Sequence, residues 1–103
     1  MIYHLTEPAR WAQSLEDGVH TGSTRGVELA QEGFIHCSSA EQWPGVRDRF
    51  YADVEVLLLL HVDETAVGCP VVWEQLGDAP AEFPHLYGPL PLDAVVRVEE
   101  LRR

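Results

Sequence analysis

One segment of the chain constrains the fold more than any other, because it is apolar on both faces of an expected strand. This segment runs from Val54 to Val62, and its centre, Val56 to Leu60, is the longest unbroken apolar stretch in the sequence. A strand that buries both faces lies inside a sheet, with cover above and below it. The sequence therefore predicts a sheet that has Val54–Val62 at its centre.

The length of the chain allows one hydrophobic core around this strand. The sequence has 103 residues, which is close to the commonest size of a single domain. A chain of this length buries about 65% of its unfolded surface when it folds, and two smaller domains would bury less. The composition, 46% hydrophobic and 23% charged, is that of a globular protein. We expect one domain over residues 1–103.

Shorter strands are expected before and after the central one. Alternation, β-branched content and bounding turn residues predict them at Met1–Leu5, Phe34–Ser38, Val71–Gln75 and Ala94–Leu101. The segments His20–Gly26 and Leu76–Pro84 are expected as loops because they are rich in small, polar or turn-forming residues. Two prolines exclude a central strand over Gly88–Asp93.

Helices are short and lie in the first half of the chain. They are expected from Glu7, with Thr6 as N-cap, to just before Gly18, over Val27–Glu32, and from Ser39 or Pro44 to about Tyr51. Because helices and strands are segregated along the chain, the sequence predicts an α+β domain with a mostly antiparallel or mixed sheet.

The charge balance excludes several classes of partner. The chain has 7 cationic side chains, all arginines, against 17 acidic ones, for a formal net charge of −10. Binding to duplex nucleic acid or to anionic membranes depends on clusters of Lys and Arg that this chain lacks. The first residues do not form a signal peptide, so we expect a cytoplasmic protein with both cysteines, Cys37 and Cys69, reduced.

Histidines are the first candidates for chemistry, because imidazole can donate and accept a proton near neutral pH. The five are His4, His20, His36, His61 and His85. Strand alternation places His36 on the same face as Phe34 and Ser38, with Cys37 turned into the core. His61 is expected to be structural, and His20, in its Gly/Thr loop, is expected to be solvated.

Three windows combine these polar groups with rigid or small neighbours. They are Ile2-Tyr3-His4, Gly33-Phe34-Ile35-His36-Cys37-Ser38, and Phe83-Pro84-His85-Leu86-Tyr87-Gly88-Pro89-Leu90-Pro91. In the third window, prolines restrict the backbone around His85 and Tyr87 and so lower the entropy lost when these side chains are held in place. Such a segment either lines a pocket or forms a braced crossover in which Tyr87 fills the core.

Common catalytic motifs are absent from the sequence. No HExxH, no G-x-S-x-G and no phosphate-binding glycine loop occurs. No carboxylate is placed beside two histidines in the way that a metal site of two histidines and one carboxylate needs. We therefore expect no metal.

The three windows resemble the bacterial family called domain of unknown function 952. The similarity covers nearly the whole chain, including Gln42, Trp73-Glu74 and Ala94-Val95-Val96. The fold of that family is similar to that of the ADP-ribosyltransferase and RNA 2′-phosphotransferase superfamily. The resemblance thus implies an ADP-ribosyltransferase-like split sheet whose cleft holds NAD.

The resemblance also implies roles for individual side chains. His4 is matched to the histidine that hydrogen-bonds a ribose hydroxyl, and His85 and Tyr87 are placed with it as cofactor-binding residues. His36 and Ser38, or Tyr87, are matched to the group near the nicotinamide. Glu74 is matched to the carboxylate that steadies a cationic ribose. The catalytic candidates are therefore His36, Ser38 and Glu74.

One departure and two alternatives accompany this expectation. The arginines Arg10, Arg25, Arg47 and Arg49 are scattered and do not match the phosphate-gripping motif of the phosphotransferases, which argues against RNA as substrate. The partner expected is a small nucleotide or metabolite. The alternatives to an ADP-ribosyltransferase-like enzyme are a non-catalytic module that binds a small metabolite, and a structural or interaction protein without a ligand.

Overall fold

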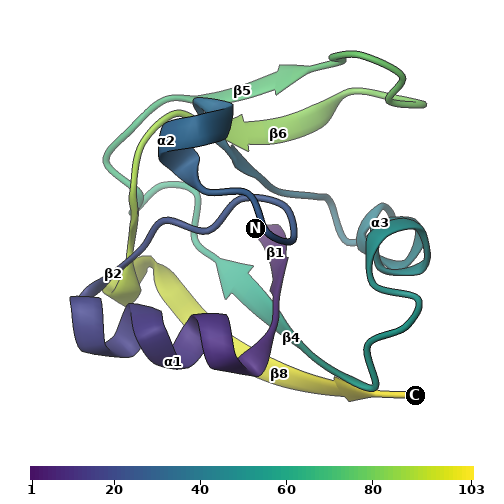
Figure 1. Ribbon diagram of the computed structural model, residues 1–103. Coiled ribbons are helices and arrows are strands. Elements are labelled where there is room, and N and C mark those ends of the chain that lie inside the picture. Colours follow the sequence, from purple (N-terminus) through teal and green to yellow (C-terminus); the bar gives the residue numbers. More distant parts are fainter.

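The apolar strand lies at the centre of a three-stranded sheet, which confirms the prediction. The computed structural model describes all residues from 1 to 103. In it, β4 (Val56–Val62) pairs with β1 (Ile2–Thr6) on one side and with β8 (Val95–Arg102) on the other. Both pairings are antiparallel. In Figure 1, β1 and β4 lie near the middle of the molecule and β8 runs along its lower edge.

Two further antiparallel sheets complete an α+β domain. One has the order β3 (Ile35–His36), β6 (Phe83–Leu86), β5 (Val71–Glu74), and the other pairs β2 (Val19–His20) with β7 (Leu90–Pro91). The prediction of a loop over Leu76–Pro84 is wrong for its last two residues, because β6 already begins at Phe83. Pro84 can occupy a middle strand because only its carbonyl is used there, as the acceptor for the N–H of Cys37.

The helices are short, and two of them end where a glycine adopts a left-handed conformation. They are α1 (Pro8–Asp17), α2 (Leu29–Glu32) and α3 (Trp43–Phe50), and a 3₁₀ turn covers Leu92–Ala94. Gly18 and Gly33, with φ of 79° and 91°, cap α1 and α2. The N-cap of α1 is Glu7 and not Thr6, because Thr6 still belongs to β1. None of the helices has the length and apolar character needed to cross a bilayer.

The start of α3 follows the sequence pattern closely. The N–H of Ser39 donates to the Oε1 of Gln42, and the N–H of Gln42 donates to the Oγ of Ser39. These reciprocal bonds form a turn ahead of the helix, which itself begins at Trp43.

Two hydrophobic clusters cover the two faces of β4. Leu60 and Val62 pack with Trp11 of α1 in one cluster, and Leu57 and Leu59 pack with α3 in the other. Alternate residues of the strand therefore belong to different clusters, as a strand with two apolar faces requires. Figure 1 shows α1 and α3 on different sides of this sheet.

Truncation of the central strand tests this arrangement. Leu59 is 1% exposed, and removal of its branched side chain in Leu59→Ala should lower the free energy of unfolding by about 2–5 kcal/mol, measured by urea denaturation. The control is Val96→Thr on the edge strand β8, where the side chain is 57% exposed and the change should stay within about 0.5 kcal/mol. Equal losses in the two variants would contradict a core centred on β4.

Candidate functional site

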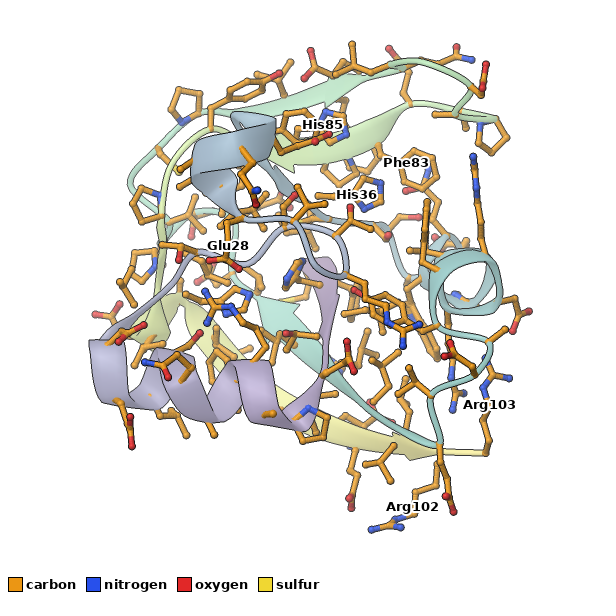
Figure 2. The ribbon with its side chains drawn as sticks, in the orientation of Figure 1. Glu28, His36, Phe83, His85, Arg102 and Arg103 are labelled. Carbon is orange, nitrogen blue, oxygen red and sulfur yellow. The ribbon has the colours of Figure 1, made fainter.

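A cavity of about 410 Å³ lies where β3, β6 and α3 meet the segment that precedes β6. Its walls include three aromatic rings, Phe34, Phe50 and Phe83. Its polar lining includes His36, His85, Arg49, Glu32 and Asp78. Figure 2 shows the side chains of Phe83, His36 and His85 gathered in this region of the molecule. A cavity of this size with mostly apolar walls and a few convergent polar groups is typical of a small-molecule site.

The pairing of β3 with β6 brings the two histidines together. Their register sets His36 opposite His85, and the centroids of the two rings lie 5.5 Å apart. Phe34 stacks on the His85 ring with centroids 3.9 Å apart, and Phe83 lies against the His36 ring at 5.0 Å. The predicted alternation is confirmed, since Phe34 and His36 point to the cavity while Cys37 lies in the core.

His36 offers the cavity a neutral imidazole. The backbone N–H of His36 donates to the Oγ of Ser23, but no protein group forms a hydrogen bond with either ring nitrogen. Burial, followed by the charges of His4, His85 and Arg49, lowers the pKa of His36 to about 4. Both ring nitrogens are therefore free for a ligand, one as donor and one as acceptor.

His85 is tied to a carboxylate on the neighbouring strand. Its Nδ1 donates to the Oε1 of Glu74, 2.9 Å away, and the hydroxyl of Tyr87 donates to the same oxygen. These hydrogen bonds, that of Tyr87 before that of His85, lower the pKa of Glu74. The bond to Glu74 raises the pKa of Tyr87. Glu74 and Tyr87 do not line the cavity. They lie behind His85 instead.

His4 and Ser38 lie beside His36 at a narrow crevice that shares His36 with the cavity. Both side chains are buried, and His4 is only 2% exposed. The Nδ1 of His4 donates to the carbonyl oxygen of His36, 2.7 Å away, and its Nε2 contacts the Nε2 of His20 at 3.0 Å. Burial, before the charge of His20, lowers the pKa of His4 to about 3. Both ring nitrogens of His4 are thus occupied within the protein.

His20 is fully buried, so the expectation that it is solvated is wrong. It lies in the short strand β2, and its Nδ1 is 2.6 Å from the Oγ of Ser14 on α1. Burial lowers the pKa of His20 to about 4. The sequence holds one local sign of this burial, Gly22, because a Cβ there would lie 3.1 Å from the His20 ring. Nothing in the sequence identifies Ser14 as the partner.

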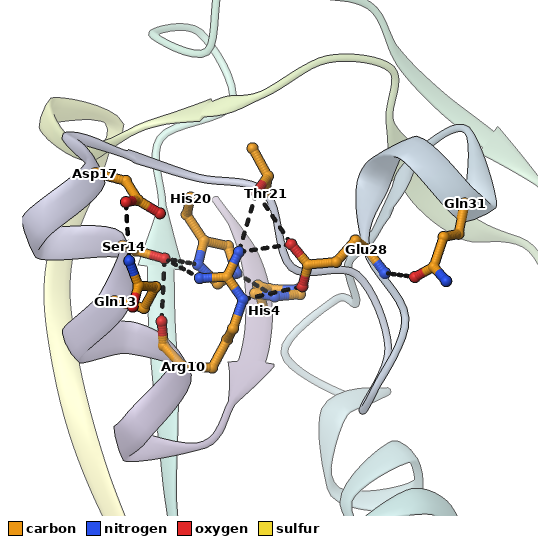
Figure 3. A network of polar contacts seen from close by, with 9 residues as sticks. All are labelled: His4, Arg10, Gln13, Ser14, Asp17, His20, Thr21, Glu28 and Gln31. Carbon is orange, nitrogen blue, oxygen red and sulfur yellow. Dashed lines mark hydrogen bonds and ion pairs between the residues drawn. The ribbon is translucent and has the colours of Figure 1, made fainter.

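Figure 3 shows the polar network that begins at these histidines. The guanidinium of Arg10 makes two hydrogen bonds to the carboxylate of Glu28 and one each to Thr21 and Ser14. Arg10 thereby ties α1 to the segment that leads into α2. It also lines a second, polar cavity of about 420 Å³, which sequence reasoning missed.

The structure therefore divides the expected site residues into three groups. His36 and His85 line the cavity together, His4 and Ser38 lie at the crevice beside His36, and Glu74 and Tyr87 lie behind His85. Sequence reasoning did not find the remaining polar and aromatic lining. Those residues include Arg49, Phe50, Glu32 and Asp78. They come from helices and loops whose spacing carries no motif.

The chain is thus a small α+β domain in which two histidines line one cavity. The chain belongs to the family described as "Protein of unknown function (DUF952)", whose sequence pattern matches residues 5–98. It is similar to protein CC0527 from Caulobacter crescentus, with 32% sequence identity. The crystal structure of CC0527 has a TM-score of 0.82, and the alignment covers 97% of this chain and 84% of that one. Its solution NMR structure has a TM-score of 0.78, with 98% and 84% covered. No protein with a curated description matches the chain.

The buried histidines should make stability depend on pH. Their pKa is about 6.5 in an unfolded chain, whereas burial lowers it to about 3 for His4 and to about 4 for His20. Between these values the unfolded state binds more protons, so the free energy of unfolding rises with pH. The stabilisation is complete above pH 6.5 and is lost as the pH falls toward 4.

Urea denaturation between pH 7 and pH 5 tests this dependence above the range in which most carboxyl groups titrate. The urea midpoint should fall steadily over this interval, while the ring signals of His4 and His20 in NMR spectra stay those of neutral imidazoles. A constant midpoint would show that these histidines gain no protons on unfolding.

Proposed function

We propose that the cavity binds NAD or a related nucleotide. The observation that carries this proposal is the combination of aromatic walls with two histidines and an arginine in one cavity of about 410 Å³. Flat aromatic rings such as nicotinamide or adenine pack well against Phe34, Phe50 and Phe83. The free ring nitrogens of His36 can bond a ribose hydroxyl or a base amide.

Arg49 supplies the cation that a nucleotide phosphate needs. None of the ion pairs of the protein includes Arg49. Its guanidinium lies over the Phe50 ring, 5.1 Å from the centroid, and lines the cavity. A single guanidinium in a chain of net charge −10 favours one or two phosphates over a polyanion. These residues therefore fit a small nucleotide.

The further proposal is an ADP-ribosyltransferase-like fold and activity, which rests on the resemblance of the three windows. Such an enzyme cleaves or transfers at the nicotinamide ribose and needs a carboxylate near the cationic ribose. Glu74 is engaged by His85 and Tyr87, so the carboxylates that face the cavity are Glu32 and Asp78. In this proposal His36 contacts the ligand directly, while His4 and Ser38 support the backbone beside it.

The orientation of Glu74 also favours a second candidate, a module that binds a nucleotide or metabolite without turning it over. The expected catalytic carboxylate points to two protein donors and not into the cavity. A cavity without that carboxylate can bind a ligand and leave its glycosidic bond intact.

Thermal denaturation with NAD tests the binding that both candidates share. A ligand at 100 times its Kd stabilises a protein by about 2.7 kcal/mol, which raises the Tm of a domain of this size by on the order of 10 °C. The His36→Ala variant should lose most of this shift. His61→Ala, at a histidine that pairs with Glu99 away from the cavity, should keep it.

Nicotinamide release then separates the two candidates. Release from NAD by the wild-type protein, and not by His36→Ala, supports the enzyme. Binding without release leaves the binding module. An unchanged Tm at millimolar NAD, ADP-ribose and AMP would remove the nucleotide proposal altogether.

A further inference from the structure

The Oε1 atom of Glu74 accepts two hydrogen bonds at once, and this determines where the hydrogen atoms of its two partners lie. The hydroxyl of Tyr87 and the Nδ1 of His85 both point to it. The two hydrogen bonds lower the pKa of Glu74, so the group is a carboxylate at neutral pH. A carboxylate has no proton to give. The hydrogen in each bond therefore belongs to the partner, and Nδ1 of His85 carries an N–H.

A neutral imidazole carries one N–H, so Nε2 of His85 is left with a free lone pair. The protein places no hydrogen-bond donor on this atom, and His85 lines the cavity. Phe34 stacks on the ring with an angle of 19° between the planes, and the carboxylate of Glu74 prevents rotation about the ring bond. The lone pair is thus held in one direction.

We propose that His85 is the proton acceptor of the cavity, through Nε2, and that Glu74 and Tyr87 are positioning residues that hold it in this state. The proposal gives new roles to three residues. His85 and Tyr87 were expected to bind the cofactor, and Glu74 was expected to steady a cationic ribose. The identity of the ligand on which His85 acts rests on the proposed function, whereas the tautomer of the His85 ring does not.

The step that this arrangement serves is the activation of an attacking hydroxyl. The O–H proton moves to Nε2 of His85, and the oxygen electron pair forms the new bond to the ribose carbon. The bond from that carbon to nicotinamide breaks, and its electron pair leaves with the neutral nicotinamide. The positive charge of the pyridinium is thus replaced by the proton on His85, which the Glu74 carboxylate stabilises.

The protein contains a second histidine–glutamate pair that serves as an internal control. The Nε2 of His61 donates to the Oε1 of Glu99, at 3.0 Å, so the N–H of this ring is on Nε2 and not on Nδ1. This pair lies between β4 and β8 and lines no cavity. The two pairs therefore predict opposite tautomers in one molecule.

Nitrogen-15 NMR of the histidine rings tests the proposal without any ligand. In the wild-type protein at neutral pH, Nδ1 of His85 should be protonated and Nε2 should not, while His61 shows the reverse. In Glu74→Ala the His85 ring should lose its preference for Nδ1–H. Glu99→Ala should change His61 and leave His85 as it is.

Tyr87→Phe separates the two positioning residues. It retains the bond between Glu74 and Nδ1, so the tautomer of His85 should persist with a weaker preference. A wild-type His85 with its proton on Nε2, or a tautomer that Glu74→Ala does not affect, would overturn the assignment. Because the wild-type spectrum alone decides the first point, the test stands even if a variant fails to fold.

Kinetics test the proton transfer itself. Loss of a general base lowers kcat by about 10²-fold to 10⁴-fold. His85→Ala should show this loss in nicotinamide release with little change in KM, and Glu74→Ala should show a smaller loss of the same kind, whereas Glu99→Ala should retain the wild-type rate. Wild-type protein that binds NAD without release, or a His85→Ala variant with an unchanged kcat, would exclude His85 as the acceptor. Failure to bind NAD would reject the proposed function and leave the tautomer result to stand by itself.

Discussion

A short seam of hydrogen bonds between β1 and the segment after β3 holds the candidate site to the core. The N–H of Tyr3 donates to the carbonyl of Ser38, and the N–H of Ser38 donates to the carbonyl of Tyr3. Beside this pair, the His4 ring donates to the carbonyl of His36. Because β1 is itself paired with the buried strand β4, the backbone that presents His36 is fixed to the central sheet of the domain.

The histidines near this seam have two different roles. His4 and His20 are buried, neutral and bonded to protein atoms through the ring nitrogens, so they act as structural polar groups. His36 and His85 keep ring nitrogens directed to the cavity and share it with aromatic walls. The chain is acidic, and its cavity contains a single arginine without an ion pair. The cavity therefore offers mainly neutral hydrogen-bond donors and acceptors, and little positive charge.

The features that the sequence predicted are those that local patterns determine. Continuous apolarity located β4, alternation separated His36 from Cys37, and Gly18 marked the end of α1. The failures depend on partners that are distant along the chain. His20 is buried because it forms hydrogen-bond contacts with Ser14 and His4. β6 includes Pro84 because it pairs with a strand on each side, β3 and β5. Local sequence patterns do not predict such contacts. For the same reason, the sequence did not identify Arg49 and Phe50 as residues that line the cavity.

The row of three contacts from Ser14 through His20 and His4 to the carbonyl of His36 joins four separate elements of the chain. Each contact forms only when its two segments are already docked, so the row assembles together with the fold. A ligand that enters the cavity therefore meets a floor that is already rigid. It loses little free energy to the ordering of the protein, and its affinity reports the fit of the cavity itself.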